Sequence, residues 1–275
     1  MIAAAASGVA LDHLALAVPD IDTALDRLRA ELGAVIISGD EVPGYRFAMT
    51  RVGDAERGMN LELLEPWQSE ADDFLERFVR RRGAAPHHIT FLQPDVRTTA
   101  DALAARGYRL VRTKFDFGPW QETFIHPEHG CGTVIQLAAS TVPAPPMAEL
   151  LDAAAAGRRP PPVPFDERSQ NPFWWAQRHP PAPRGARPAV LERVAVEVAD
   201  LGLVRELFLG ALGGELCSES PTSIEVAWGT TGRIRFARAS EPGVRALELS
   251  GLAREFDLGS ARFRRSPRHV SRTID

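Results

Sequence analysis

The stretch that decides the fold lies near the start of the chain and reads Leu11-Asp12-His13-Leu14-Ala15-Leu16-Ala17-Val18-Pro19-Asp20. Alternation predicts a β-strand in which His13 shares its face with the small Ala15 and Ala17, while bulkier side chains occupy the opposite face. Asp20 is typical of a helix N-cap, so the strand is expected to run directly into a helix. A single histidine on such a strand would most simply be a hydrogen-bonded core residue. The recurrence of the stretch argues for a different role.

The same pattern occurs twice more along the chain. Pro86–Asp95 aligns His88 with His13, and Leu191–Asp200 aligns Arg193 with the same position. Each strand is followed by an amphipathic stretch that ends at a glycine, as helices often do. Three such units in register predict an internally duplicated fold.

Each unit is expected to close with an apolar strand that carries one polar residue. These strands are Asn60–Pro66, Val134–Ala138 and Ala246–Ser250, and their polar residues are Glu62, Gln136 and Glu248. The polar residues follow the positions aligned with His13 by 49, 48 and 55 residues. Further strand candidates lie between helix and closing strand in the first two units, so each unit reads as strand, helix, then several strands.

Composition limits the class of protein and its partners. The chain has 275 residues, of which 44% are hydrophobic and 25% charged, which is ordinary for a soluble protein. A net charge of −4 argues against nucleic acid as the main partner. No apolar run predicts a membrane span, and Met1–Ala10 lacks the basic start of a signal peptide. Two cysteines far apart suit a reducing, cytoplasmic environment.

The pattern divides the chain into four parts. Residues 9–140 hold the first two units, and residues 190–251 hold the third. Residues 141–188 contain twelve of the 22 prolines and are predicted to be a linker. Its Trp174-Trp175 pair is expected to fold back onto a unit, either as packing or as a lid. Residues 252–275 are expected to be an arginine-rich tail.

The first two units resemble the vicinal oxygen chelate superfamily, which includes glyoxalase, bleomycin resistance proteins and dioxygenases, and within it the methylmalonyl-CoA epimerase-like branch. The resemblance lies in Asp12–Asp20, Leu61–Pro66, His87–Ile89, Phe124–Pro127 and Gly132–Leu137. It implies an α+β fold in which tandem βαβββ modules form a curved, mixed-sheet half-barrel, here followed by a third, degenerate module.

The resemblance also implies a divalent metal held by the first and last strands of both units. Carried over position by position, the ligands are His13, Glu62, His88 and Gln136. Two imidazoles, one carboxylate and one amide oxygen suit Zn²⁺, Co²⁺, Mn²⁺, Ni²⁺ or Fe²⁺. Gln136 departs from the epimerase pattern, in which a glutamate is usual, and leaves the site one unit more positive. Phe47 is a second departure, close to where an epimerase would place another carboxylate base.

The implied function is that of a metal-dependent enzyme acting on a small molecule. We expect isomerase, epimerase or lyase chemistry on a carbonyl or carboxyl compound, acyl-CoA included. Candidate bases are Glu62, Glu122 and Glu65. One alternative is an Fe²⁺ dioxygenase that uses His13, His88 and Glu62 as its ligands. Another is a non-catalytic protein that binds a small molecule or confers resistance to it.

The third unit departs from the ligand pattern. Arg193 and Glu248 occupy its two ligand positions, and arginine does not bind metals. The two are expected to form an ion pair in a non-catalytic module. No fourth unit is apparent to complete a second half-barrel, so the third is expected either to pack on the first domain or to pair with its copy in a homodimer.

Overall fold

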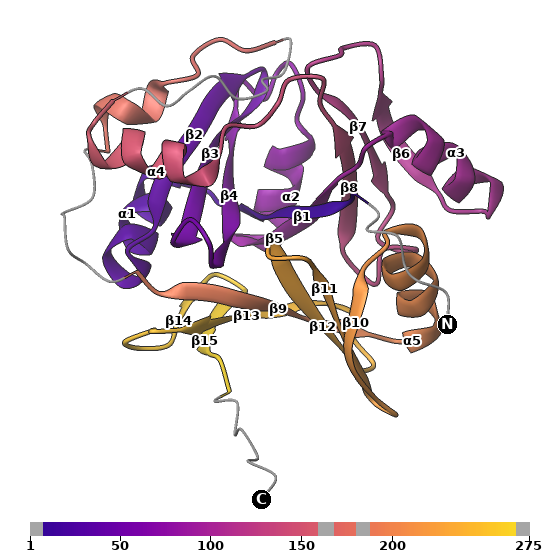
Figure 1. Cartoon of the computed structure of the whole chain (residues 1–275). Helices are drawn as coiled ribbons and strands as arrows, with labels where there is room; N and C mark the ends of the chain where they lie inside the picture. The colour runs from indigo at the N-terminus through magenta and orange to yellow at the C-terminus, as the bar shows by residue number, and fades with distance from the viewer. Residues whose placement is uncertain (1–7, 159–167, 180–187, 268–275) are drawn as a thin grey trace, which may run out of the picture.

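The computed structural model describes residues 8–158, 168–179 and 188–267, and it contains two mixed β-sheets of eight and seven strands. The two sheets lie one above the other, with the N-terminal half of the chain in the upper sheet of Figure 1. None of the described helices is long and apolar enough to cross a membrane.

The eight-stranded sheet consists of two consecutive modules. The first contains β1 (Ala10–Ala17), α1 (Ile21–Leu32), β2 (Val35–Val42), β3 (Gly44–Gly53) and β4 (Gly58–Trp67). After the connecting helix α2 (Phe74–Arg82), the second contains β5 (Ala85–Leu92), α3 (Val96–Ala105), β6 (Leu110–Lys114), β7 (Gln121–Ile125) and β8 (Val134–Ala139). The strand order β2-β3-β4-β1-β5-β8-β7-β6 places the first strands of both modules side by side at the centre. The expected pair of βαβββ modules is therefore confirmed.

Local sequence signals set the helix boundaries in both modules. The Asp20 carboxylate accepts a hydrogen bond from the Thr23 amide at 2.8 Å, and Asp95 does the same for Thr98 at 3.0 Å. These caps satisfy amides that the first turn of a helix leaves unpaired. At the other end of α1, Gly33 adopts a left-handed φ of 65°, which a glycine reaches without strain.

The seven-stranded sheet repeats this arrangement in reduced form. Its complete module contains β9 (Val190–Val198), α5 (Leu201–Val204) continued by the π-helical turn η2 (Arg205–Ala211), β10 (Glu215–Ser220), β11 (Ser223–Trp228) and β12 (Gly232–Arg238). The chain then forms β13 (Gly243–Ser250), β14 (Phe256–Leu258) and β15 (Ala261–Arg265). The strand order is β10-β11-β12-β9-β13-β15-β14.

The closing strand of the third module differs from the expected Ala246–Ser250. The strand that pairs in parallel with β9 is β12, just as β4 pairs with β1. In contrast, β13 runs antiparallel to β9, as β5 runs antiparallel to β1. Glu248 therefore lies opposite Arg193 where Thr90 lies opposite His13. The reason is that β12 precedes β13 in the chain and carries its own buried pair, Ile234 and Phe236, so it takes the place beside β9 that Ala246–Ser250 was expected to fill.

A shortened fourth unit follows, which the sequence analysis did not foresee. β13 pairs in parallel with β15, as β5 does with β8, but no helix lies between them. β14 and β15 lie within the segment that we expected to be an arginine-rich tail. Ala261 and Phe263 of β15 are buried while Arg262 between them is exposed, so strand alternation was concealed by the many arginines. Residues 268–275 lie outside the described part of the chain.

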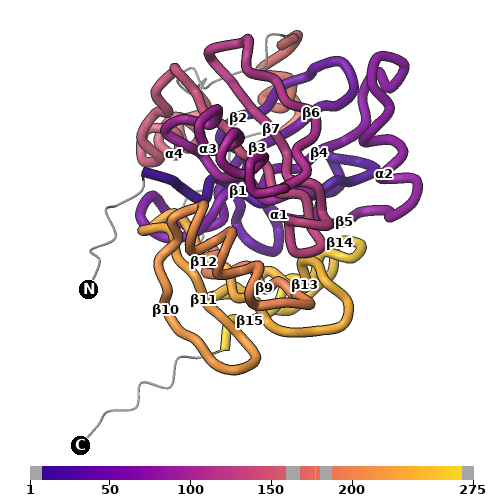
Figure 2. The backbone as a smooth tube through the Cα atoms, turned by 90° about the vertical axis from the view of Figure 1, so that its right-hand side faces the viewer, coloured from indigo at the N-terminus to yellow at the C-terminus, as the bar shows by residue number. Residues whose placement is uncertain are grey.

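The two sheets share one hydrophobic core through their back faces. It joins Leu14 of β1 and Phe91 of β5 to residues of the second sheet and of its helix. The Phe91 ring centroid lies 4.8 Å from that of Trp228. At Gly232 an added Cβ would lie 2.7 Å from Leu11 Cδ2, so the sheets approach closely. Figure 2 shows from the side how the second sheet lies beneath the first. The His13 face of the first sheet therefore points away from the shared core.

The segment between the two sheets is folded back onto the first module. α4 (Met147–Ala155) and the 3₁₀ turn η1 (Trp174–Gln177) lie beside β2. Trp174 and Trp175 are both buried, and Trp174 Nε1 donates a hydrogen bond to the Phe47 carbonyl at 3.1 Å. The tryptophans thus pack against the sheet edge. The prolines at 160–162 lie outside the described residues.

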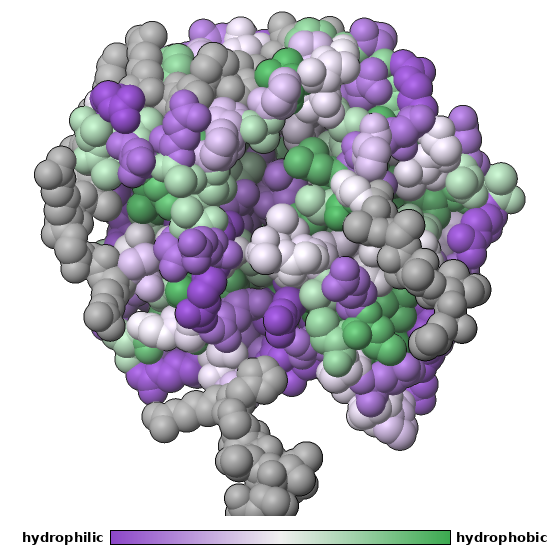
Figure 3. All heavy atoms as spheres, in the orientation of Figure 1, coloured by the Kyte–Doolittle hydropathy of each residue, from purple (hydrophilic) through white to green (hydrophobic). Residues whose placement is uncertain are grey.

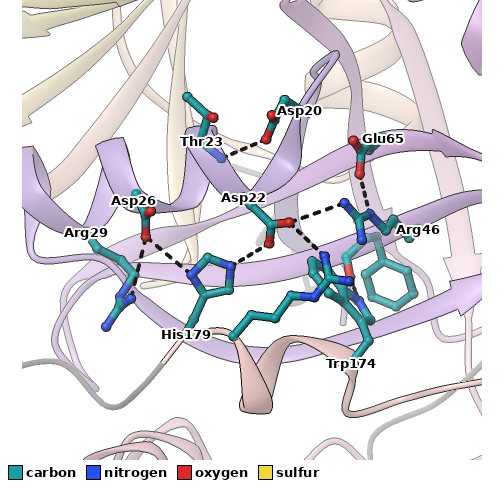
Figure 4. Close-up of polar contacts among 11 residues, drawn as sticks. Asp20, Asp22, Thr23, Asp26, Arg29, Arg46, Glu65, Trp174 and His179 are labelled. Atoms are coloured by element: carbon teal, nitrogen blue, oxygen red, sulfur yellow. Dashed lines mark hydrogen bonds and ion pairs between the residues drawn. The ribbon is translucent and has the colours of Figure 1, made fainter.

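A cluster of charged residues holds η1 against α1 (Figure 4). His179 Nε2 lies 2.8 Å from one oxygen of Asp22, and Arg178 donates to the other oxygen at 2.8 Å. Arg46 also pairs with Asp22 and stacks over the Trp174 ring at 4.6 Å. Although burial opposes the shift, the hydrogen bonds from His179 and Arg178 lower the pKa of Asp22.

Candidate metal centre and its cavity

The two candidate histidines lie on adjacent central strands. His13 is on β1 and His88 on β5, and the antiparallel register places Ala15 opposite His88 and Thr90 opposite His13. Strand alternation turns both side chains to the face opposite the shared core, where their ring centroids are 5.6 Å apart. Both are buried, with 3% and 6% of their surface exposed.

Glu62 completes a compact group between the two rings. It lies on β4, which pairs in parallel with β1 and places Glu62 beside Ala15. Its Oε2 lies 3.4 Å from His13 Nε2 and 3.6 Å from His88 Nε2. The potential ligand atoms of the three residues all lie within 4.8 Å of one another.

The chemistry of this group fits a divalent metal ion. Among the described residues, the buried Nε2 of His88 has no hydrogen-bond partner, a situation that is unfavourable unless another species fills it. The Asp12 carboxylate lies 2.7 Å from His13 Nδ1 and orients that ring with Nε2 toward Glu62. A carboxylate behind a histidine is typical of metal sites, because it fixes the tautomer of the ligand. Two imidazole nitrogens and one carboxylate suit a borderline divalent ion.

Gln136 lies beside the three charged or titratable candidates. It is on β8, opposite Thr90 in the parallel register with β5. Its Oε1 accepts a hydrogen bond from Thr90 Oγ1 at 2.6 Å, and the same hydroxyl lies 2.8 Å from His13 Nε2. Its Nε2 donates to Glu122 at 2.7 Å. The amide oxygen therefore faces the histidines, while the amide nitrogen faces away from them.

The candidate bases are separated by the fold. Glu122 on β7 lies on the wall of the cavity above the cluster, where Trp120 Nε1 also donates to it at 2.9 Å. Glu65 is paired with Arg46 and is not among the described residues that line this cavity. Glu65 lies three residues after Glu62 on β4. Because this spacing is odd, the side chain of Glu65 points to the other face of the strand, away from the cavity.

Charges within the cluster shift the histidine pKa values in opposite directions. Burial alone would lower the pKa of His13, but the carboxylates of Glu62 and Asp12 outweigh it and raise that pKa to about 10. Burial lowers the pKa of His88 well below its usual value, and the neighbouring His87 and His13 add to the effect. Burial and the charge of Arg112 lower the pKa of His87 to about 4. The two carboxylates therefore favour the protonated form of His13, whereas burial favours the neutral form of His88.

The cluster opens into a cavity of about 570 Å³. Its walls are mainly apolar and aromatic, and they come from both modules and from the segment after β8. The aromatic members are Tyr45, Phe47, Phe74, Trp120 and Phe124. The space-filling view shows a hollow in the middle of this face of the molecule (Figure 3). Phe47 lies on the wall, so β3 contributes an aromatic ring there and no carboxylate.

Three residues that support the cluster were missed in the sequence. Asp12 orients His13, Thr90 bridges His13 and Gln136, and Trp120 donates to Glu122. Thr90 follows His88 by two residues, so alternation alone could have placed it on the same face. Asp12 lies at a register shift within β1 and Trp120 lies just before β7, and the residue pattern predicts neither position.

The equivalent place in the second sheet is filled by ion pairs. Arg193 donates to Glu248 at 2.6 Å, which is the expected pair, and also to Glu225 at 2.6 Å. Arg235, which takes the register position of Glu62, donates to Glu248 at 3.0 Å. Within the described residues, no second group of metal-binding side chains accompanies the His13 cluster.

One comparison with known protein families matches most of the first sheet. A family model described as the glyoxalase/bleomycin resistance protein/dioxygenase superfamily matches residues 12–124. No curated protein matches the chain in sequence.

Several solved structures resemble the chain. A Streptomyces coelicolor methylmalonyl-CoA epimerase variant in complex with 2-nitronate-propionyl-CoA is 26% identical, covers 48% of this chain and 98% of its own, and has a TM-score of 0.43. The Mycobacterium tuberculosis methylmalonyl-CoA epimerase is 24% identical over 52% of this chain and 94% of its own, with a TM-score of 0.44. A hypothetical protein from Staphylococcus aureus is 11% identical, covers 93% of this chain and 98% of its own, and has a TM-score of 0.54, so it shares the fold of both sheets. Residues 12–124 of this chain, from β1 to β7, are therefore similar to the glyoxalase/bleomycin resistance protein/dioxygenase superfamily.

Proposed function

We propose that this chain is a metal-dependent enzyme that acts on a carbonyl or carboxyl compound in the cavity of the first sheet. The observation that carries the proposal is the buried His13–Glu62–His88 group, in which the His88 Nε2 lacks a partner within the described residues and two imidazoles converge on one carboxylate. We assign Gln136 as the fourth ligand, because its amide oxygen is turned toward the same point by Thr90.

A divalent metal bound there would polarise the oxygen atoms of a substrate and so acidify a neighbouring C–H bond. The chain's own residues then bind, orient and move the proton. Glu122 is the carboxylate that we assign to proton transfer, because it lies on the cavity wall and is positioned by Trp120 and Gln136. Glu62 is a second candidate base.

The wall composition favours chemistry with one proton-transfer group. Epimerisation requires an acid or base on each face of the reacting carbon. Phe47 occupies the β3 wall, and Asp12 is already hydrogen bonded to His13. We therefore propose an isomerase or lyase reaction ahead of a full epimerase reaction, with acyl-CoA compounds among the substrates to test.

A second candidate function rests on the ligand set itself. Two histidines and one carboxylate on neighbouring strands are also the ligands of non-haem Fe²⁺ oxygenases. An Fe²⁺ dioxygenase would require Gln136 to leave a coordination position open for O₂.

The free, widely separated Cys131 and Cys217 suit a reducing compartment, and we propose a cytoplasmic location. A homodimer stays a prediction.

Metal analysis tests the proposal directly. Protein purified without a histidine tag is expected to hold about one equivalent of a transition metal, and a His13→Ala/His88→Ala variant none. His126→Ala, which changes a histidine in the turn after β7, is the matched control and should bind like the parent. Turnover with Fe²⁺ and O₂ alone would favour the dioxygenase. A parent that stays metal-free after exposure to Co²⁺, Mn²⁺, Zn²⁺ and Fe²⁺ contradicts the proposal and favours a binding protein.

A further inference from the structure

We propose that the segment 140–150, here called the strap, forms one wall of the cavity and selects a substrate with a compact hydrophobic body. The inference rests on the proposed function for the polar end of that substrate, whose oxygen atoms would face the His13 cluster. The inference adds the chemical class of the rest of the substrate. The evidence comes from the strap's attachment, from the opposite walls and from the cations around the opening.

The strap leads from the end of β8 into the first turn of α4 and crosses the open side of the first sheet (Figure 1). It is fixed at both ends. At the first end the Thr141 amide donates to the Gly118 carbonyl at 3.1 Å, and Ser140 caps the turn at Val142. At the second end α4 packs beside β2, with Leu150 buried. Between these anchors the strap is rich in proline, which donates no backbone hydrogen bond.

The strap turns apolar side chains into the cavity. The residues that line it are Val142, Pro143, Ala144, Pro145, Met147 and Leu150. Met147 is half-buried, whereas the adjacent Ala148 is exposed and does not line the cavity. An apolar segment that is fixed at both ends over a cavity excludes water from a ligand bound beneath it. The strap therefore contributes to a binding surface for hydrophobic groups.

The walls facing the strap are apolar as well. Ile37, Tyr45 and Phe47 come from the first module, and Trp120 and Phe124 come from the second. The His13 cluster forms another part of the lining, and each of its potential ligands is at least nine-tenths buried. A ligand that fills the cavity therefore meets oxygen-binding groups at one end and hydrocarbon along its length.

Arg112 lines the cavity and is already engaged in other contacts. Its guanidinium pairs with Asp72 and stacks over the Phe74 ring at 4.4 Å. It occupies a bulge between Val111 and Lys114 and has a positive φ of 52°, a conformation that non-glycine residues rarely adopt. Arg112 and Arg168 are the arginines among the described lining residues. So few cations favour a compact substrate over one that carries several phosphate groups.

Cavity volume agrees with this class. Ligand sites of about 300–1,000 Å³ hold drug-sized molecules, and this cavity measures about 570 Å³. A molecule with only a methyl group beside its oxygens would leave most of the apolar wall uncovered. A ring or branched chain next to a pair of vicinal oxygens would cover it. We therefore assign the substrate to hydroxy or oxo acids with an aromatic or branched body.

Calorimetric titration of the Co²⁺-loaded full chain tests the assignment with two probes. Mandelate and lactate present the same hydroxy-carboxylate and differ in a phenyl against a methyl group. We expect mandelate to bind at least about tenfold more tightly, because the ring is removed from water. Met147→Gln should weaken mandelate binding about fivefold and leave lactate binding unchanged. Ala148→Gln, the matched control, should alter neither.

A third probe separates this inference from the metal proposal. 2-Phenylethanol has no chelating group and is titrated into metal-free protein, where its binding should again weaken in Met147→Gln. If the protein takes up no metal but binds this alcohol, the proposed function fails and the hydrophobic cavity stands. If metal binds while mandelate is no tighter than lactate, or acetyl-CoA is tighter than mandelate, the substrate class is wrong and the metal proposal stands. Absence of alcohol binding, or equal binding by parent and Met147→Gln, overturns the role of the strap.

Discussion

Replacing Glu122 by glutamine tests whether this residue fixes the position of Gln136. The Glu122 carboxylate accepts hydrogen bonds from Gln136 Nε2 at 2.7 Å and from Trp120 Nε1 at 2.9 Å. A hydrogen bond to a charged group contributes about 1.5–3 kcal/mol and one between neutral groups about 0.5–1.5 kcal/mol. Each bond therefore loses about 1 kcal/mol when the carboxylate becomes an amide. Because Glu122 is only half-buried, we expect a total loss of about 1–2 kcal/mol in the free energy of unfolding.

Urea denaturation of the metal-free protein, followed by tryptophan fluorescence, measures this loss. Glu128→Gln makes the same chemical change on an exposed turn and should stay within about 0.5 kcal/mol of the parent. The exchanged pair Glu122→Gln/Gln136→Glu restores one amide–carboxylate hydrogen bond and should recover part of the loss. Parent-like stability of Glu122→Gln would refute the reasoning. The amide of Gln136 would then be free to turn, and its oxygen would not be fixed toward Thr90.

Three further predictions concern the parts that surround the site. Arg193→Leu should lower the free energy of unfolding, measured in urea, by about 2–3 kcal/mol, because it leaves the buried Glu248 without this partner. The double variant Arg193→Leu/Glu248→Leu should lose less than the sum of the two single variants. Additive losses would show that the pair is not coupled. Asp22→Asn should lower the free energy of unfolding at pH 7 by about 0.5–1 kcal/mol, because the pKa of Asp22 is lowered in the folded state by His179 and by arginines. That stabilisation is present above pH 3.8 and is lost as the pH falls through the lower folded-state value, so a difference that persists in strong acid would contradict it. Gly39→Ala places a Cβ 2.6 Å from the Phe47 carbonyl oxygen and 2.7 Å from Trp175 Cδ1, and it should destabilise the protein by about 1–3 kcal/mol. Unchanged melting would show that β3 and the tryptophan segment both yield without strain.

The first sheet was predictable because its signals are local and repeated. The stretches around His13 and His88 alternate regularly, and each ends in a capping aspartate and a helix. Their register then follows, since two antiparallel central strands can bury only one face against a shared core. Alternation predicts that His13 and His88 lie opposite the bulky side chains of their strands, and the family resemblance adds Glu62 to them.

The second sheet was predicted less well because two of its strands carry the same residue pattern. Both Gly232–Arg238 and Gly243–Ser250 are apolar with interspersed charged residues, and the sequence alone does not show which one pairs with the strand of Arg193. The 55-residue spacing to Glu248, against 48 and 49 in the other units, was the available signal. Support from Asp12 and Trp120 was missed for a related reason, since side-chain hydrogen bonds depend on geometry that spacing does not specify.

The core that the two sheets share has a consequence for how this chain can change over generations. The second sheet carries Arg193 and Arg235 at the positions equivalent to His13 and Glu62, so its outer face is not restricted to the residue types of a metal site. Its inner face stays constrained, because Trp228 packs on Phe91 and Gly232 leaves room for Leu11 directly behind the strands that carry the histidines. Substitutions should therefore accumulate on one side of every second-sheet strand and be rejected on the other. The second sheet thus acts as a structural support for the sheet that carries the histidine cluster.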